Sequence, residues 1–501
     1  MRKKQAFKIA INLIIIMSWV VMMTLLIKKE GILKSRGTES YFRELIPRDI
    51  EVDAWKSLYI SDQWAGYVHT TMGPYQERER EGYLINGVSY LRFNMFEQLK
   101  EIEINSVQVL DTAFRVLKFE ARISGMTRII VTGKRLGDHL LVEIRHNRAR
   151  YKKVFEGEED FFLENSILSI YRGKGLKKGD SYTLNLFNPL TLTAEPTRVE
   201  VIEKEGDLFV LETKYAGLSS RSWVDKEGQV VREETANGWV MKLETKEEIE
   251  ALLKENPGKG VDILRDAAVI TKRKLKNPRE VDYLKLRVSG IDMADFPMDG
   301  RRQSLLDETG GIVEIRAVPP DMEEVMALPY EGSELREYLK PSIWIQCRDP
   351  KLRSKALEII GEESNSWEAV KRLSEWVNEN VNKAFSVGIP VATSVLANRE
   401  GDCNEHTVLF VALARACGIP AEMSAGFVYL EDGFYYHAWP KVYVGKWVHV
   451  DPTFGQFIAD ATHFELVSGD FSAQTKLALT MGKIHMEILE TQVRRETIDQ
   501  D

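Results

Sequence analysis

Cys403 is the residue of this sequence that is best placed to act as a nucleophile. Asp402 before it and Glu405 after it have the spacing of a capping box, in which Asp402 caps a helix and Glu405 occupies its third position. This register puts Cys403 at the first position of a helix that ends at Gly418. Because unpaired backbone N–H groups and the positive end of the helix dipole face that position, we expect a lowered thiol pKa and a reactive thiolate.

The other two cysteines are expected to pack in the interior, which is the usual fate of a free cysteine. Cys417 falls in the apolar last turn of the same helix, and Cys347 follows the apolar run 343–345. An odd total of three cysteines does not describe a disulfide framework, so at least one thiol remains free. The position of Cys403 at a capped helix end favours catalysis there over packing.

A thiol nucleophile needs a base within hydrogen-bond reach, and the base needs a group that orients it. His437 lies on an expected strand, 434–444, and Asp451 ends the next expected strand, 447–451. A single histidine on a strand is more often structural than catalytic. A capped cysteine, a strand histidine and an aspartate at a strand end nevertheless form a specific set for nucleophilic catalysis.

The turn between these two strands decides whether His437 and Asp451 can meet. Since side chains alternate between the faces of a sheet, a two-residue turn would put them on opposite faces. We therefore predict a three-residue turn centred on Gly445, or a bulge. With that turn Trp439 lies opposite Asp451, and His437 becomes its diagonal neighbour.

Residues from about 339 to 466 resemble the transglutaminase-like superfamily, which includes animal transglutaminases, peptide N-glycanases and many bacterial proteins. Four blocks carry the resemblance: Gly401-Asp402-Cys403, Arg415-Ala416-Cys417-Gly418-Ile419-Pro420-Ala421, His437-Ala438-Trp439 and Trp447-Val448-His449-Val450-Asp451-Pro452-Thr453. The resemblance implies a papain-like α+β core, with Cys403 as nucleophile, His437 as general base and acid, and Asp451 orienting His437. Pro440-Lys441 departs from the family pattern, which usually has an acidic residue and no proline there.

The reaction that the resemblance implies is attack of Cys403 on an amide carbonyl of a peptide or protein substrate, which forms a thioester. Water would resolve the thioester in a protease or amidase, and an amine would resolve it in an acyltransferase. The backbone N–H of Cys403 is one expected donor to the oxyanion, and Trp376, Asn398 and Asn404 are alternatives for the second. No cofactor is expected.

Two other functions use the same residues. A zinc ion could be held by Cys403, His406, His437, His449 and His463, but none of them has the paired spacing of zinc motifs, so we expect no metal. The fold could also serve as a non-enzymatic envelope binding module, which the complete Cys–His–Asp set disfavours.

A net charge of −8 without an internal basic block argues against a nucleic-acid partner.

The N-terminal residues have the pattern of a membrane anchor. Residues 9–27 form a 19-residue stretch without charge, between positively charged flanks. As a helix this stretch would span about 28 Å, close to the hydrocarbon thickness of a bilayer. It ends without a small-residue cleavage site, so we predict a retained single-pass anchor over residues 1–30 in the inner or plasma membrane. The flanking charges favour an exported body, periplasmic or extracellular.

Three regions are expected after the anchor. Residues 31–265 form a β-rich exported domain, because apolar and polar residues alternate between turn signals. Residues 266–330 form a connecting β segment, and residues 331–501 form the transglutaminase-like catalytic domain. Helices are expected at Lys246–Glu255, Lys351–Ile360 and Ser366–Val381. The fold class is therefore α+β: a papain-like core at the C-terminus, preceded by an antiparallel β-rich domain and an N-terminal transmembrane helix.

Overall fold

A computed structural model describes most of the chain from residue 51 to residue 493. The segments left out within this range are 78–79, 96–97, 126–127, 147–148, 157–160, 168–175, 190–191, 216, 236, 294–295, 385–389, 470–472, 475–476, 478–479 and 481. The expected anchor, residues 1–30, lies outside the described residues. None of the helices within the described ranges is both long enough and apolar enough to span a membrane.

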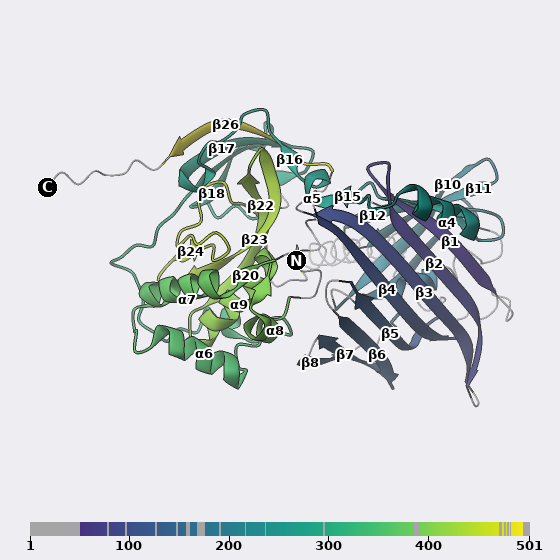
Figure 1. Ribbon diagram of the computed structural model, residues 1–501, viewed down its shortest axis with the longest axis horizontal. Helices are drawn as coiled ribbons and strands as arrows, with labels where there is room; N and C mark the ends of the chain where they lie inside the picture. Colours follow the sequence, from purple (N-terminus) through teal and green to yellow (C-terminus); the bar gives the residue numbers. More distant parts are fainter. Residues whose placement is uncertain are drawn as a thin grey trace, which may run out of the picture.

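The first half of the chain forms one large, curled antiparallel sheet (Figure 1). Its strand order is β8-β7-β6-β5-β4-β3-β2-β1-β14-β13-β12-β11-β10-β9, and β15 joins β3 in parallel. The strands are β1 (Val52–Ile60), β2 (Gln63–Glu77), β3 (Arg80–Met95), β4 (Gln98–Asp111), β5 (Val116–Ser124), β6 (Ile129–Leu136), β7 (His139–His146), β8 (Ala149–Glu156), β9 (Ser181–Asn188), β10 (Thr193–Glu205), β11 (Leu208–Tyr215), β12 (Leu218–Val224), β13 (Val230–Glu234), β14 (Val240–Glu244) and β15 (Val261–Asp262). The rings of Phe119 on β5 and Phe187 on β9 lie 5.9 Å apart, so the sheet folds back over its own core.

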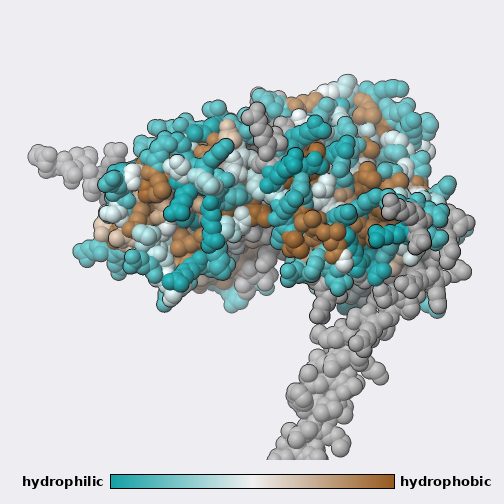
Figure 2. Space-filling model, turned by 90° about the horizontal axis from the view of Figure 1, so that it is seen from below, coloured by the Kyte–Doolittle hydropathy of each residue, from teal (hydrophilic) through white to brown (hydrophobic). Residues whose placement is uncertain are grey.

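The second half is built on two long strands, β22 (Ala421–Leu430) and β23 (Gly433–Tyr443). They share a sheet with β16 (Val269–Ile270), β24 (Trp447–His449) and β25 (Phe464–Gly469). Four helices pack at one end of these strands: α6 (Pro350–Ile360), α7 (Ser366–Asn380), α8 (Ala392–Asn398) and α9 (Cys403–Ala416) (Figure 1). Figure 2 shows a face on which hydrophilic side chains are interspersed with apolar patches, because the surface of a folded protein still contains much apolar area.

A smaller sheet packs at the other end of β22 and β23, with order β18-β19-β17-β26. Its strands are β17 (Val281–Ser289), β18 (Gln303–Asp307), β19 (Ile312–Arg316) and β26 (His485–Val493). On β17 the side chains of Leu284, Leu286 and Val288 are all buried, so this strand turns one face toward the core. The sequence did not predict that β26, about two hundred residues away, pairs with β17 and closes this sheet.

The helices follow their local signals closely. The helix α4 (Lys246–Glu255) has the predicted bounds, and Thr245 and Glu248 form a capping box at its start. α6 and α7 begin within one residue of the predicted positions, with Asp349 and Asn365 as their caps. These boundaries were predictable because side-chain caps satisfy the first N–H groups locally.

The predicted three-residue turn between β23 and β24 is confirmed. Tyr443 pairs with Trp447, which leaves Val444, Gly445 and Lys446 in the turn. Gly445 has a φ of 107°, and a Cβ atom there would lie 1.9 Å from the carbonyl oxygen of Glu324. Only glycine fits this position, and the register that brings Asp451 toward His437 depends on it.

We predict that Gly445→Ala destabilises the protein by about 2–3 kcal/mol, because it adds a backbone clash to an unfavourable φ. Denaturant unfolding of the full chain measures this. The control is Gly300→Ala, because Gly300 also has a positive φ of 70°, but a Cβ atom there would have no neighbour within 4 Å. The control should cost only about 1 kcal/mol. Equal losses in the two variants would show that the contact with Glu324 does not fix this turn.

Candidate active site

Cys403 is the first residue of α9, as predicted. The side chain of Asp402 accepts a hydrogen bond from the backbone N–H of Asn404 at 2.8 Å. The side chain of Glu405 accepts one from the N–H of Asp402 at 3.0 Å, which completes the capping box. A Cβ atom on Gly401 would lie 2.2 Å from the Cβ of Glu405, so glycine is required just before the cap. The local sequence therefore determines where the thiol sits.

The expected lowering of the Cys403 pKa is wrong for this structure. Burial raises the pKa of this thiol well above its ordinary value, and the carboxylates of Asp402, Glu405 and Asp451 add to the rise. A hydrogen bond from the backbone of Ala438 acts in the opposite direction but does not outweigh them. A thiol with this shift is protonated at neutral pH and has to lose its proton before it can act as a nucleophile.

Cys347 and Cys417 are buried, as predicted from their apolar neighbours. Burial raises the pKa of Cys417 to about 12 and also raises that of Cys347. Cys347 donates a hydrogen bond through its sulfur to the carbonyl of Leu339 at 3.6 Å. Both thiols are thus packing groups with little nucleophilic character at neutral pH.

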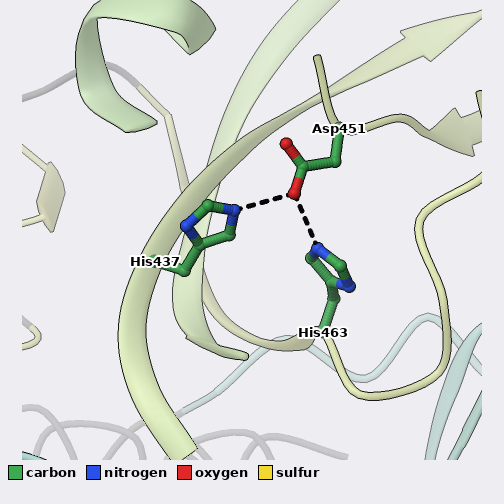
Figure 3. Close-up of side chains that lie close together, drawn as sticks. All are labelled: His437, Asp451 and His463. Carbon is green, nitrogen blue, oxygen red and sulfur yellow. Dashed lines mark hydrogen bonds and ion pairs between the residues drawn. The ribbon is translucent and has the colours of Figure 1, made fainter. Parts of the chain in front are cut away.

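His437 and Asp451 meet in the interior, with Nε2 of His437 2.8 Å from Oδ2 of Asp451 (Figure 3). The other oxygen of Asp451 accepts from the backbone N–H groups of Thr453 at 2.8 Å and Phe454 at 3.2 Å. Since a carboxylate only accepts, Nε2 of His437 carries a hydrogen and Nδ1 is left to take a proton. Cys403 lies beside the same strand, because its sulfur bonds the backbone of Ala438, the residue after His437.

Charge in this region is balanced around the buried aspartate. Burial alone would raise the pKa of Asp451, but His437 and His463 hold it far below its ordinary value. Burial lowers the pKa of His437, although Asp451 opposes the change. The directions of these shifts favour a neutral imidazole at His437 and a neutral thiol at Cys403.

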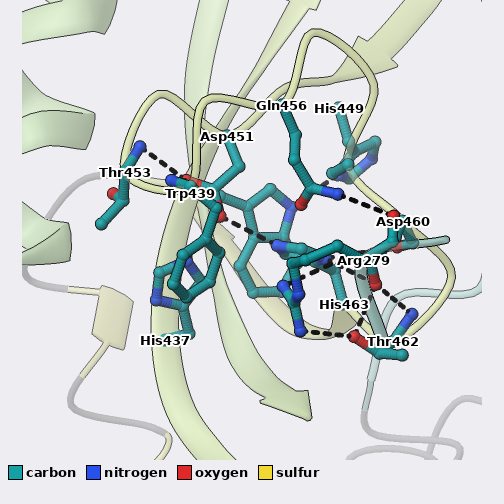
Figure 4. Close-up of polar contacts among 12 residues, drawn as sticks. Arg279, His437, Trp439, His449, Asp451, Thr453, Gln456, Asp460, Thr462 and His463 are labelled. Atoms are coloured by element: carbon teal, nitrogen blue, oxygen red, sulfur yellow. Dashed lines mark hydrogen bonds and ion pairs between the residues drawn. The ribbon is translucent and has the colours of Figure 1, made fainter. Parts of the chain in front are cut away.

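Sequence reasoning missed a second partner of Asp451. Nε2 of His463 lies 3.0 Å from the same Oδ2 that His437 contacts. From the sequence, His463 was considered only as one of five possible zinc ligands. It is reached through the irregular segment between β24 and β25, so no periodic pattern pointed to it (Figure 4).

The histidines that were considered as zinc ligands make separate contacts with other groups. His406 places its ring nitrogens 2.7 Å from the carbonyl of Asp402 and 3.2 Å from that of Val381. His449 accepts a hydrogen bond from the indole of Trp439 at 2.9 Å. Among the described residues, donor atoms of His437, Asp451 and His463 lie within 4.8 Å of one another, and hydrogen bonds to Asp451 account for this spacing.

The three alternatives for the second oxyanion donor have different surroundings. The ring of Trp376 is covered by the guanidinium of Arg399, 4.4 Å from its centroid. Asn398 is the last residue of α8. Asn404 follows the nucleophile, and its Oδ1 is buried without a hydrogen-bond partner in the described part of the chain. The second donor thus stays a prediction.

Comparison with known proteins identifies the family of one part of the chain. Residues 353–452 match the model of the transglutaminase-like superfamily, so this part of the chain is a transglutaminase-like domain. It stands beside a large antiparallel β-rich region. No curated protein matches the chain significantly.

Several solved structures are similar to parts of this chain at low sequence identity. A protein from Cytophaga hutchinsonii, provisionally described as a cysteine protease, has 17% identity and a TM-score of 0.29, covering 44% of this chain and 89% of its own. The periplasmic domain of TgpA from Pseudomonas aeruginosa, bound to ethylmercury, has 16% identity and a TM-score of 0.24, covering 38% and 89%. A β-barrel-like protein of a domain of unknown function, DUF1849, from Brucella abortus has 13% identity and a TM-score of 0.30, covering 40% and 98%.

The raised pKa of Cys403 gives a prediction about its alkylation. In the His437→Ala variant, the rate of iodoacetamide labelling should rise about tenfold per pH unit from about pH 7 to above pH 9, because only the thiolate reacts. Mass spectrometry of the peptide that contains Cys403 measures the rate. Cys417 in the same sample is the internal control and should label more slowly, since its pKa is raised to about 12. A plateau reached below about pH 8 would mean that the helix end outweighs burial.

Proposed function

We propose that this protein is a cysteine-dependent amide hydrolase or acyltransferase that acts on peptide or protein amides. The observation that carries the proposal is the capped thiol of Cys403 beside the strand on which His437 bonds Asp451 at 2.8 Å. A nucleophile, a base and a group that orients the base are the three parts that this chemistry needs. The match to the transglutaminase-like superfamily supports the same chemistry.

The proposed reaction begins with a thiol and a neutral imidazole. As the sulfur of Cys403 attacks the amide carbonyl, Nδ1 of His437 takes the thiol proton, and Asp451 stabilises the imidazolium that forms. The carbon–nitrogen bond then breaks, and His437 returns the proton to the departing amine. Water or a second amine attacks the thioester, His437 takes a proton from it, and the proton returns to Cys403. The product is an acid or a new amide.

The backbone at the start of α9 supports the proposal in a second way. The first N–H groups of a helix have no partner within the helix and can stabilise negative charge on the carbonyl oxygen. The cap uses the N–H groups of Asp402, Asn404 and Glu405. It leaves the N–H of Cys403 for the oxyanion in our proposal.

We also propose that the protein is anchored in a membrane and that its body is exported. The uncharged stretch 9–27 would anchor the chain in a membrane, with the catalytic domain exported. Carbonate extraction of membranes, followed by protease treatment of intact cells or spheroplasts, tests both parts. Release of the chain by carbonate would contradict the anchor, and protection of the body from external protease would contradict export.

The proposed function predicts that p-nitrophenyl acetate, an activated acyl donor, acetylates Cys403. Asp451→Asn should slow the acetylation about a thousandfold, because His437 loses its orientation and the charge that stabilises its protonated form. A burst of nitrophenolate and the mass of the modified peptide measure the reaction. An added primary amine should speed deacylation only if the enzyme is an acyltransferase.

The control for this experiment is Asp321→Asn, which removes an exposed carboxylate paired with Lys446 at 3.0 Å. It should acetylate at the wild-type rate. Equal rates for Asp451→Asn and Asp321→Asn, or no acetyl group on Cys403 of the wild-type chain, would favour the binding-module alternative.

A further inference from the structure

A second buried histidine shares the catalytic carboxylate. His463 and His437 both contact Oδ2 of Asp451, at 3.0 Å and 2.8 Å (Figures 3 and 4). His463 is fully buried, and it lies beyond residues 353–452, which match the family model. A charged or polar group is buried at this depth only when it is well paired. The pairing of His463 with Asp451 therefore points to a role for His463 at this site.

The far side of His463 is held by a carboxylate and an arginine. Its Nδ1 lies 3.3 Å from Oδ1 of Asp460, and Oδ2 of Asp460 forms an ion pair with Arg279 at 3.0 Å. The guanidinium of Arg279 also lies over the ring of Phe454, 4.6 Å from its centroid. Phe454 in turn stacks on His437, with the ring centroids 4.8 Å apart. Successive contacts thus connect Arg279, Asp460, His463 and Asp451, and Asp451 in turn bonds the base, His437.

The segment that carries His463 is fixed from the smaller sheet. Arg302 is buried, and its guanidinium donates to the carbonyls of Ala459 at 3.1 Å, Asp460 at 2.8 Å and His463 at 3.2 Å. Gln303 next to it donates to the carbonyl of Glu465 at 2.8 Å. These bonds fix the backbone on both sides of the imidazole. The ring has little freedom to leave Asp451.

We propose that His463 is a positioning residue for the acyl transfer: held by Asp460 and Arg279, it fixes Oδ2 of Asp451 and offsets part of its charge. His437 then stays neutral between turnovers and is ready to accept the thiol proton. This inference rests on the proposed function. His463 acts only through Asp451 and His437 and takes no proton from substrate.

The charges around His437 support this role. The charged groups around it are Asp451, His463 and Arg279, and the rings of Phe454 and Trp439 stack beside it. Both ring nitrogens of His463 face carboxylate oxygens, Oδ1 of Asp460 and Oδ2 of Asp451, which only accept, and this arrangement suits a protonated ring. Burial acts to lower the pKa of His463, but Asp460 and Asp451 outweigh it and the net shift is upward. A cation whose ring lies 5.6 Å from that of His437 disfavours a second cation there. Removing it should raise the pKa of His437.

The test is the pH dependence of Cys403 acetylation by p-nitrophenyl acetate in the full chain. The wild-type rate should fall in acid as His437 becomes protonated. In His463→Gln the midpoint of this fall should move to higher pH by about one unit. Gln keeps an amide donor toward Asp451, so its rate at high pH should stay within about tenfold of wild type. His463→Ala should lose about a hundredfold more, because Asp451 is no longer held.

The matched control is His449→Gln. His449 is also buried, but its pKa is held well below the ordinary value by burial, Arg302 and nearby cations, so it carries no charge to lose. Its replacement should leave the acid midpoint unchanged. Asp460→Asn is the second variant for the case in which position 463 tolerates no change. It weakens the support for the cation and should move the midpoint upward as well.

The outcomes separate the two proposals. If His437→Ala leaves both the rate and the acid midpoint of the wild type unchanged, the proposed function fails. If that variant loses activity but neither His463→Gln nor Asp460→Asn moves the midpoint, only the role of His463 is overturned. An equal shift in His449→Gln would also overturn it, because general loosening of the core would then explain the change.

Discussion

The buried carboxylate of Asp451 is the group on which the rest of this half of the molecule depends. It is completely inaccessible to solvent. An isolated carboxylate at this depth would be too unfavourable to ionise, so its charge has to be matched by donors. Two histidines and two backbone N–H groups supply them. Each donor requires a different part of the chain to be in register.

The need to hold these donors against Asp451 accounts for several structural features that are otherwise unrelated. The glycine-centred turn aligns Asp451 with the strand of His437. The loop after Asp451 closes through paired backbone bonds with Gln456, at 2.7 and 2.8 Å, and Asn378 on α7 holds it from outside by donating to the carbonyl of Pro452. The smaller sheet fixes the segment of His463 through Arg302. A disturbance in any of these elements should therefore reach His437 through Asp451.

The sequence was informative where the physical cause is local. The capping box around Cys403, the ends of α6 and α7, and the parity of the turn at Gly445 depend on neighbours a few residues apart. The pairing of β26 with β17 and the contact of His463 with Asp451 could not be predicted, because both join segments that only the folded chain brings together. The predicted direction of the Cys403 pKa shift was wrong for a related reason. The helix end is a local effect, whereas burial and the surrounding carboxylates depend on the complete fold.

The span that matches the family model contains Cys403, His437 and Asp451, but it ends one residue after Asp451. His463 pairs with Asp451 from the other side, and His463 and the two groups that hold it, Asp460 and Arg279, all lie outside this span. The second half of the chain is thus better regarded as one electrostatic unit than as a catalytic domain with attached strands. His437 inside the matched span and His463 outside it together supply the positive charge and hydrogen bonds that let the buried Asp451 stay ionised. The hydrogen bonds of Arg302 and Gln303 to the 459–465 segment connect the smaller sheet with His437 through His463 and Asp451.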